Sequence, residues 1–510
     1  MKQSSAASGL DLPADIDRWA ADQRWFAGKG HSPVLRSIGN WLLPTDRSEV
    51  RIRCHLVVDT ASRFGTLYQL PLTERRTPLA DAAAGLIGQG TAADGSPLFV
   101  YDATYDPAFA AALLGFMHTG GAVPLANVPA GEVPTGVAAR GMEFQALSAD
   151  GTPTAGSPPN GGALAGMTVT ASRVLSGEQS NTSIIIELAD RSGRPARGVI
   201  CKVFRVIAAG QNPDVAVQSA LALAGSRFVP EPVGTVSGDW LDSSSAARQS
   251  GDLVFAQEFL PGVEDAWRVA LAAADAGDDF QGPARALGTA TATVHRDLAS
   301  AFPTVAATAE MVDQLCASMR ERYRLAASEV PELAAHREAI LSIFERAQAA
   351  TWPRLQRIHG DYHLGQVLDV PGRGWVLIDF EGEPLRPLAE RSRPDIPLRD
   401  VAGMLRSFSY AGASVMMRDP ARDPELLAWT LRARVAFLEG YLGPGGTLGD
   451  QEPLLAAFEL DKAIYEAVYE SRNRPSWLPI PLVSVQRLAD AASTSPSSPV
   501  RPAPQVARGE

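Results

Sequence analysis

Two acidic residues, eighteen positions apart, carry the clearest chemical signal in the segment 357–383. Asp361 lies in the motif HGDYH and is followed by Gln366, while Asp379 ends the apolar run WVLI and is followed two positions later by Glu381. Transfer of a phosphoryl group from ATP needs a carboxylate to deprotonate the attacking hydroxyl and oxygen ligands to hold Mg²⁺. We therefore expect Asp361 to be the catalytic base. The expected ligands of Mg²⁺ are Gln366, Asp379 and Glu381, although Glu381 could instead anchor its loop.

Each of the two motifs is a weak signal by itself. An HGD tripeptide often forms a turn before a helix, and a DFE tripeptide can simply end a buried strand. Their ordered combination is far more specific, because an amide residue follows the first aspartate and a β-like run separates the two motifs. Together they predict the catalytic loop and the metal loop of a kinase.

A lysine on the ATP side is expected in such an enzyme, and Lys202 is the candidate. It lies in the apolar strand-like run VICKVF, where a lysine is rare unless its charge has a partner. The alternative is a lysine on an edge strand that reaches solvent. Asp214 is one acidic candidate for the partner, but it could equally be the N-cap of the helix that begins there.

Two further segments could contact ATP. Residues 176–183, SGEQSNTS, lie between two predicted strands and offer hydroxyl and N–H groups to phosphates, although an ordinary hairpin turn is an equal alternative. Residues 257–262, QEFLPG, end a predicted strand and precede helices, which suits a hinge whose backbone amides bind adenine. The candidate ATP contacts in these segments are Ser180, Asn181, Thr182, Gln257 and Phe259.

The acceptor side is predicted in the segment 461–477, which is rich in carboxylates, guanidinium groups and aromatic rings. Such groups bind sugar hydroxyls and stack on sugar rings. The alternative is an amphipathic helix with packed tyrosines and solvated charges, and Arg406 could form a structural ion pair. The predicted acceptor contacts are His363, Arg406, Tyr465, Glu466, Tyr469, Arg472 and Trp477.

The surrounding patterns predict an α+β, bilobal protein-kinase-like fold with a β-rich N-lobe, a helical C-lobe and an N-terminal cap subdomain. Alternating apolar residues predict strands at 50–58, 66–70, 168–175, 181–188, 198–205 and 253–259. Helical patterns cover 106–117, 213–224, 263–276, 283–298, 306–328, 332–350, 398–412, 424–442 and 453–473. The predicted divisions are a cap at 1–140, a Gly/Pro-rich connector at 141–166, an N-lobe at 167–261, a C-lobe at 262–490 and a disordered tail at 491–510.

Composition excludes several other classes of protein. The chain has 510 residues and a net charge of −11, which argues against a general nucleic-acid binder. Its three cysteines are scattered and fit a reducing compartment, and the sequence shows neither an N-terminal apolar signal region nor a run long enough to cross a membrane. We expect a cytoplasmic protein whose partner is a small molecule, with no nucleic acid and no membrane.

Several motifs resemble those of the actinobacterial maltokinases, a branch of the aminoglycoside-phosphotransferase and eukaryotic-like kinase group. The shared motifs are HGDYHLGQVL, LIDFEGEP, PLRDVAGMLRSF, RWFAGKG at 24–30, GEQSNTSI at 177–184, NPDV at 212–215 and YEAVYESRNRPSWLPIPL at 465–482. The resemblance implies the cofactors ATP and Mg²⁺ and phosphorylation of maltose to maltose 1-phosphate for α-glucan and glycogen synthesis. Extra residues at 188–197 depart from the pattern. A kinase for glucosamine, another amino sugar or an aminoglycoside is the alternative, and a non-catalytic kinase-like binding protein is the second.

Overall fold

The structure is a computed structural model of the chain, which forms two compact units. The first unit comprises Met1–Val263 with Leu368–Ser392, and the second comprises Glu264–Val367 with Arg393–Glu510. Each unit is described separately below. The described residues are 12–28, 32–62, 65–80, 82–92, 94–123, 138–144, 163–175, 181–242, 247–383 and 388–494.

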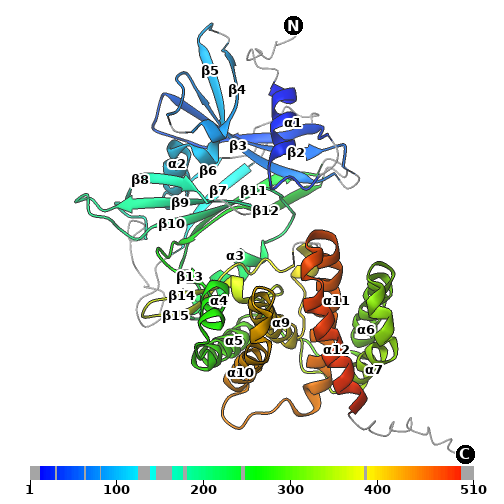
Figure 1. Ribbon diagram of the computed structural model, residues 1–510. Helices are drawn as coiled ribbons and strands as arrows, with labels where there is room; N and C mark the ends of the chain where they lie inside the picture. The colour runs from blue at the N-terminus through cyan, green and yellow to red at the C-terminus, as the bar shows by residue number, and fades with distance from the viewer. Residues whose placement is uncertain are drawn as a thin grey trace, which may run out of the picture. The chain divides into compact units, whose positions relative to one another are not determined.

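The N-terminal part of the first unit is an antiparallel five-stranded sheet with the order β1-β2-β3-β5-β4 (Figure 1). Apolar residues alternate along the second strand and are buried, as the sequence predicts for a sheet with one covered face. Trp25, Phe26 and Tyr68 form a small aromatic core beside the first helix. The elements are α1 (Leu12–Asp22), β1 (Leu35–Leu42), β2 (Val50–Asp59), β3 (Leu67–Arg75), β4 (Leu86–Thr91), β5 (Pro97–Asp102) and α2 (Pro107–His118).

A seven-stranded antiparallel sheet with the order β6-β7-β11-β12-β10-β9-β8 completes most of the first unit. Four of these strands were expected, but β6, β7 and β11 were not, because glycine and proline interrupt their apolar patterns. β7 crosses the predicted cap boundary, so this sheet begins earlier in the chain than residue 167. The elements are β6 (Ala122–Val123), β7 (Ala138–Glu143), β8 (Thr168–Val174), β9 (Asn181–Ala189), β10 (Val199–Phe204), α3 (Pro213–Leu223), β11 (Pro232–Leu241) and β12 (Arg248–Glu258).

The two sheets of the first unit share one hydrophobic core, to which α2 contributes. Gln69 of β3 donates hydrogen bonds to the carbonyl oxygens of Phe204 and Leu253, at 3.2 and 3.0 Å. Arg205 is fully buried and donates to Asp102 at 2.6 Å and to Thr182 at 2.8 Å. The cap and the β-rich lobe are therefore joined by buried polar contacts as well as by apolar packing.

The hairpin of β14 (Val367–Val370) and β15 (Gly374–Leu377) also packs in the first unit. Arg373 donates to the carbonyl oxygen of Arg227 at 2.7 Å and to Glu258 at 3.0 Å. The backbone N–H of Leu377 donates to the carbonyl of Phe228 at 2.7 Å. These contacts assign residues 368–392 to the β-rich unit, whereas the sequence analysis placed them in the helical lobe by their position in the chain.

The second unit is helical, as the sequence predicts (Figure 1). The sequence does not predict α12, because Pro479 and Pro481 suggest a break in the helical pattern. Proline is nevertheless accepted in the first turn of a helix. Since α12 ends at Thr494, the predicted tail begins too early, and residues 495–510 lie outside the described part. The elements are β13 (Glu264–Asp265), α4 (Ala266–Ala276), α5 (Gln281–Ala301), α6 (Ala309–Glu329), α7 (Arg337–Ala349), α9 (Leu398–Met416), α10 (Asp423–Leu442), α11 (Glu452–Asn473) and α12 (Pro479–Thr494), while α8 (Leu388–Arg391) belongs to the first unit.

Helices α5 and α10 approach closely at two glycines. A Cβ atom on Gly288 would lie 2.0 Å from the carbonyl oxygen of Phe437, and one on Gly440 would lie 2.0 Å from that of Arg285. Both distances are far shorter than a van der Waals contact. The crossing of these helices therefore depends on the absence of a side chain at both positions.

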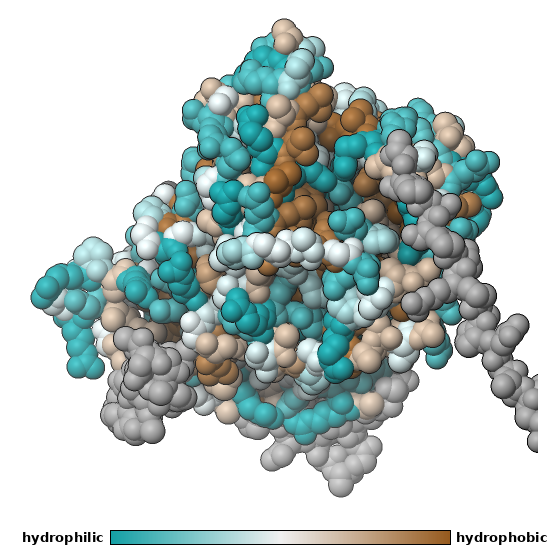
Figure 2. Space-filling model, turned by 90° about the horizontal axis from the view of Figure 1, so that it is seen from below, coloured by the Kyte–Doolittle hydropathy of each residue, from teal (hydrophilic) through white to brown (hydrophobic). Residues whose placement is uncertain are grey.

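Most large apolar side chains in the described ranges are buried, but α10 carries an exposed apolar row. Leu427, Leu431 and Val435 are 54%, 61% and 46% exposed and lie on one side of the helix because they are four residues apart. Figure 2 shows that hydrophobic residues reach the surface among hydrophilic ones on the face seen from below. In the described part of the chain, no helix combines the length and the apolar character needed to cross a bilayer.

Candidate active site

Lys202 of β10 forms two buried ion pairs in the first unit. Its ammonium group lies 2.7 Å from a carboxylate oxygen of Asp214 and 2.7 Å from one of Asp379. Burial disfavours the charged lysine, but the two carboxylates outweigh it and hold the pKa of Lys202 well above its usual value. Lys202 is therefore a charged lysine with partners and not one that reaches solvent from an edge strand.

Asp214 is the acidic partner that the sequence left undecided. The N-cap of α3 is Asn212, whose side chain accepts from the backbone N–H of Asp214 at 2.8 Å. The Asp214 carboxylate is thus available for Lys202, and its second oxygen accepts from Gln218 at 2.6 Å and from the backbone N–H of Phe380 at 2.8 Å. Asp214 consequently joins the lysine strand, helix α3 and the metal loop.

Three carboxylates gather around this lysine. Asp214, Asp379 and Glu381 offer oxygen atoms that all lie within 4.8 Å of one another. Burial, together with the charges of Asp379 and Asp214, raises the pKa of Glu381 to about 7 against the opposing charge of Lys202. One ammonium group does not balance three carboxylates, and hard oxygen ligands are those that Mg²⁺ prefers. The residues present therefore fit a divalent cation.

The backbone of the metal loop is strained at the predicted ligand. Asp379 has a φ of 65°, and it is the non-glycine residue with positive φ in the described part of the chain. This conformation is costly for a residue with a Cβ and persists where surrounding contacts hold it. The hydrogen bond from the N–H of Phe380 and the ion pair with Lys202 are two such contacts.

Of the ATP contacts predicted in the segment 176–183, one lies at the Lys202 site and one lies on the other side of the sheet. Asn181 donates to Glu381 at 2.7 Å and so joins the carboxylate cluster. Thr182, its neighbour on β9, points to the opposite side of the sheet and accepts from Arg205, because successive side chains of a strand alternate. The structure therefore does not bring Thr182 to the Lys202 site. Ser180 lies outside the described residues.

The predicted hinge residues lie at the end of β12. Gln257 is buried opposite Ile200, and its side-chain oxygen has no hydrogen-bond partner within the described part of the chain. The backbone N–H of Phe259 donates to the carbonyl of Gly198 at 2.9 Å, so the sheet already uses this amide. Of the two, Gln257 is thus the residue with a free acceptor for a ligand.

The predicted catalytic loop lies in the second unit and is anchored by Asp400 of α9. This carboxylate accepts from the backbone N–H groups of His359 at 2.8 Å and Gly360 at 2.9 Å. It also lies 3.0 Å from the Nε2 atom of His295. Burial disfavours the charged carboxylate, but the hydrogen bonds and charge of His295 and the backbone of Gly360 hold the pKa of Asp400 below its usual value. An ionised side chain thus fixes the loop.

The loop also packs on α9 and on α5, which carries Thr291. The backbone N–H of Leu364 donates to the hydroxyl of Ser407 at 3.1 Å, and Tyr362 shares a hydrogen bond of 2.9 Å with Thr291. A Cβ atom on Gly403 would lie 2.5 Å from the carbonyl oxygen of Tyr362. The glycine therefore allows the helix to approach the loop.

Asp361 has a partner that the sequence analysis missed. The Nζ atom of Lys462 on α11 lies 3.4 Å from the Oδ1 atom of Asp361 and 5.3 Å from the ring of Tyr465. The sequence does contain a signal, since only four of its 46 basic residues are lysines. The two lysines in the described ranges, Lys202 and Lys462, both contact carboxylates of the predicted kinase motifs.

His363 and Gln366 shape the end of the catalytic loop. The Nδ1 atom of His363 accepts from the backbone N–H of Gly365 at 3.1 Å, which caps the short helix η4 (Leu364–Gln366). Gln366 is the last residue of that helix and belongs to the second unit, whereas Asp379 and Glu381 belong to the first. The carboxylate cluster of Asp214, Asp379 and Glu381 lies within the first unit.

Several residues predicted to contact the acceptor form ion pairs within the protein. Arg406 is buried and lies 2.7 Å from a carboxylate oxygen of Glu466, which is the structural role that the sequence left open. Arg472 forms an exposed pair with Glu329, so the structure does not bring it to Asp361 or Lys462. Among the predicted contacts, the ring of Tyr465 lies beside Lys462.

The aromatic residues near the end of α11 stack with arginine. The guanidinium group of Arg474 lies 4.6 Å from the ring centre of Trp477 and 5.6 Å from that of Tyr469. Trp477 also stacks on Tyr410 with 6.3 Å between ring centres. Tyr469 remains 45% exposed. Trp477 and Tyr469 therefore pack against Arg474. The exposed part of the Tyr469 ring remains accessible to a ligand.

Comparison with known families identifies the class of protein. Residues 175–442, more than half of the chain, match the phosphotransferase enzyme family, and the chain therefore belongs to it. Residues 19–106 match the maltokinase N-terminal cap domain. The resemblance to maltokinases within the aminoglycoside-phosphotransferase group is thus confirmed.

Two characterised relatives are both glucosamine kinases. The chain is 30% identical over 339 residues to the glucosamine kinase of Streptacidiphilus jiangxiensis, which covers 63% of this chain and 74% of the relative. It is 29% identical over 347 residues to that of Mycolicibacterium smegmatis, which covers 65% of this chain and 83% of the relative.

Solved structures of glucosamine kinase are similar in fold. One crystal form matches with a TM-score of 0.61 at 20% identity and covers 96% of this chain and 100% of the other. A complex with glucosamine, ADP and inorganic phosphate matches with a TM-score of 0.59 at 21% identity, covering 94% and 99%. The predicted α+β kinase-like fold with an N-terminal cap is confirmed.

Proposed function

We propose that this protein is an ATP-dependent sugar kinase. The observation that carries the proposal is the buried bridge from Lys202 to Asp214 and Asp379, which joins the predicted phosphate-binding lysine to the predicted metal loop. A strand lysine paired with a helix carboxylate and a metal-loop aspartate is the arrangement that protein-kinase-like enzymes use for ATP. Membership of the phosphotransferase family supports the same conclusion.

In this proposal, the first unit holds the nucleotide. Lys202 binds phosphate oxygens, and Asp214 keeps it charged and oriented. Asp379 and Glu381 hold Mg²⁺, which neutralises phosphate charge when it is bound, and Asn181 orients Glu381 through their hydrogen bond of 2.7 Å. The free side-chain oxygen of Gln257 is a candidate acceptor for the adenine amino group.

The second unit supplies the base for the acceptor hydroxyl. Asp361 accepts the hydroxyl proton, and Asp400 fixes the loop that carries it through the backbone N–H groups of His359 and Gly360. Lys462 orients the Asp361 carboxylate through their ion pair of 3.4 Å. Gln366 is the further candidate for a metal ligand from this unit.

Two acceptors have specific support. The match of residues 19–106 to the maltokinase cap favours maltose, phosphorylated at its anomeric hydroxyl. The similarity to two glucosamine kinases favours glucosamine equally. His363, Tyr465, Glu466 and the exposed face of Tyr469 are the acceptor contacts that we propose for either sugar.

Measuring the release of ADP with each sugar identifies the acceptor. The purified chain should turn over in the presence of ATP and Mg²⁺ with maltose or glucosamine, and not with glucose or an aminoglycoside at the same concentration. ³¹P NMR of the product would identify the phosphorylated position. Lack of turnover with every sugar would overturn the proposal and favour a non-catalytic binding protein.

The base assignment has its own matched pair of variants. Asp361→Asn should bind ATP normally but lose turnover by about 10³-fold, because general-base catalysis contributes factors of this order. Asp369→Asn makes the same chemical change at an exposed position of β14 and should be as active as the unaltered protein. Equal activity of both variants would show that Asp361 is not the base.

A further inference from the structure

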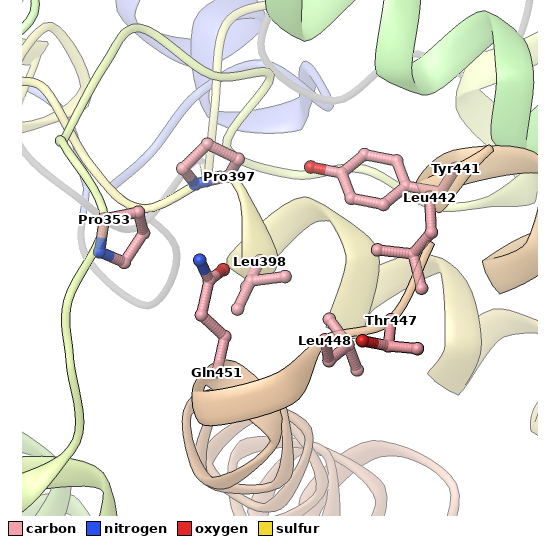
Figure 3. A pocket seen from close by; sticks show the side chains of 8 residues that line it. All are labelled: Pro353, Pro397, Leu398, Tyr441, Leu442, Thr447, Leu448 and Gln451. Carbon is pink, nitrogen blue, oxygen red and sulfur yellow. The ribbon is translucent and has the colours of Figure 1, made fainter. Parts of the chain in front are cut away.

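A pocket of about 260 Å³ lies in the second unit, and its described lining contains none of the predicted catalytic, metal or acceptor residues (Figure 3). Its apolar wall includes Pro397, Leu398 and Leu448, and its polar groups are the side chains of Tyr441, Thr447 and Gln451. In Figure 3 the hydroxyl of Tyr441 and the amide of Gln451 point toward the space beside Pro397. Among the described residues that line the pocket, none has a charged side chain.

Two walls of this pocket lead to the anchor of the catalytic loop. Pro397 and Leu398 lie at the start of α9, within three residues of Asp400. On the opposite wall, the hydroxyl of Tyr441 lies 3.0 Å from Nδ1 of His295, whose Nε2 lies 3.0 Å from Asp400. A chain of hydrogen bonds thus runs from the pocket through His295 and Asp400 to the backbone of the catalytic loop.

The chemistry of the lining restricts the ligand. A phosphate, carboxylate or ammonium group would lose its hydration here without an opposite charge in the described lining, which is costly. An uncharged ring with one apolar face and several hydroxyls would instead contact the proline and leucine side chains and hydrogen-bond to the polar groups. A hydroxyl with one partner, such as that of Tyr441, keeps further hydrogen-bonding capacity.

The size of the pocket points to a single ring. Pockets for drug-sized ligands enclose roughly 300–1,000 Å³, and this one is slightly smaller at about 260 Å³. We propose that it is a second binding site for a neutral monosaccharide, through which the sugar acts on the catalytic loop. Binding of this ligand does not depend on the proposed kinase function, but its effect on turnover does.

The proposed effect follows from the hydrogen-bond chain. A ligand that hydrogen-bonds to Tyr441 and packs on Leu398 would restrict the partner of His295 and the start of α9, the helix that carries Asp400. It would thereby change how firmly the loop with Asp361 is held. Because a ligand shifts a conformational equilibrium only by its differential affinity, the effect should saturate with occupancy of the pocket.

The binding experiment uses methyl α-D-glucopyranoside, whose blocked anomeric position prevents phosphorylation there. Saturation-transfer NMR with the full chain should show binding that Leu448→Trp weakens by about tenfold or more, since the indole fills the pocket. Gln451→Ala should weaken it as well. Leu427→Trp is the matched control, because Leu427 lies on the same unit in the exposed row of α10.

Equal binding by Leu448→Trp, Gln451→Ala and the unaltered chain would overturn the proposal, as would the absence of any binding. In the kinase assay, a saturating amount of the glucoside should change kcat in the unaltered chain and in Leu427→Trp but not in Leu448→Trp. Tyr441→Phe should still bind the glucoside while losing this effect on kcat. If the glucoside binds in the pocket but kcat never changes, the link to the loop is wrong; if no sugar is phosphorylated, the proposed kinase function fails while the binding result stands.

Discussion

The ammonium group of Lys462 lies 3.4 Å from a carboxylate oxygen of Asp361, although a hundred residues separate them in the chain. The contact joins helix α11 to the catalytic loop within the second unit. It places a positive charge beside the proposed base without the help of a ligand. The ion pair orients the carboxylate that we propose as the base.

Lys462→Met should therefore lower kcat by about 10–100-fold and leave the KM for ATP nearly unchanged, because the charge acts at the acceptor hydroxyl. Lys462→Arg should restore part of the rate. Steady-state kinetics with ATP and sugar varied separately would measure both effects. A loss confined to the KM for ATP would contradict this role, and Arg418→Met, at an exposed ion pair, serves as the control.

Asp214→Asn should weaken ATP binding and reduce stability. The change removes one of the two negative partners of a buried lysine, and breaking a buried pair typically costs a few kcal/mol. Because Asp379 still pairs with Lys202, we expect about 1–3 kcal/mol from denaturant unfolding and about tenfold weaker ATP binding. Glu231→Gln removes an exposed pair with Arg197 and should change stability by less than about 1 kcal/mol.

Gly288→Ala should destabilise the second unit by about 1–3 kcal/mol or more, because the added methyl group would collide with the backbone of α10. Gly282→Ala lies on the same helix, where a Cβ meets no atom within 4 Å. It should be neutral or slightly stabilising, since alanine favours a helix. Thermal unfolding of the two variants side by side tests the crossing. Similar melting temperatures would show that the helices can separate without cost.

Acid should destabilise the cap through His55 of β2. Burial, with a smaller contribution from the nearby charge of Arg53, lowers the pKa of His55 to about 4. The unfolded chain, with an ordinary histidine pKa of about 6.5, then binds the proton first, so the stability contribution is lost as the pH falls from about 6.5 to 4. His55→Gln should accordingly lose less stability than the unaltered chain between pH 7 and pH 5 in urea titrations. An equal loss in both would rule out His55 as the source.

The sequence predicts the chemistry where residues act through short motifs. Lys202, Asp361 and Asp379 lie in short sequence patterns that indicate both the chemical group and the local backbone conformation. The structure places Lys202 and Asp379 in direct contact. Asp214 was ambiguous, because an acidic residue at a helix start is equally an N-cap. Its role depends on Asn212, two residues earlier, which takes over the capping.

Long-range contacts explain the main omissions. Lys462 lies on an amphipathic helix and gives no local sign of its contact with Asp361. Composition alone predicts Arg406 and Arg472 as acceptor contacts. In the structure they form ion pairs with Glu466 and Glu329, and these pairs depend on how the helices pack. Thr182 is predicted as an ATP contact because it belongs to the loop motif 176–183, but the alternation of side chains along β9 directs it toward Arg205.

Burial of Arg205 beneath the cap has a consequence for how the protein can be divided. Its guanidinium group is enclosed by Asp102 of the cap, Thr182 of the β-rich lobe and the ring of Trp25, 5.1 Å away. Without residues 12–123, that charge would face an exposed apolar sheet, so the cap is not a lid that swings away from the lobe. The match to the cap family ends at residue 106, whereas the hydrophobic core continues from the cap into the β-rich lobe without interruption.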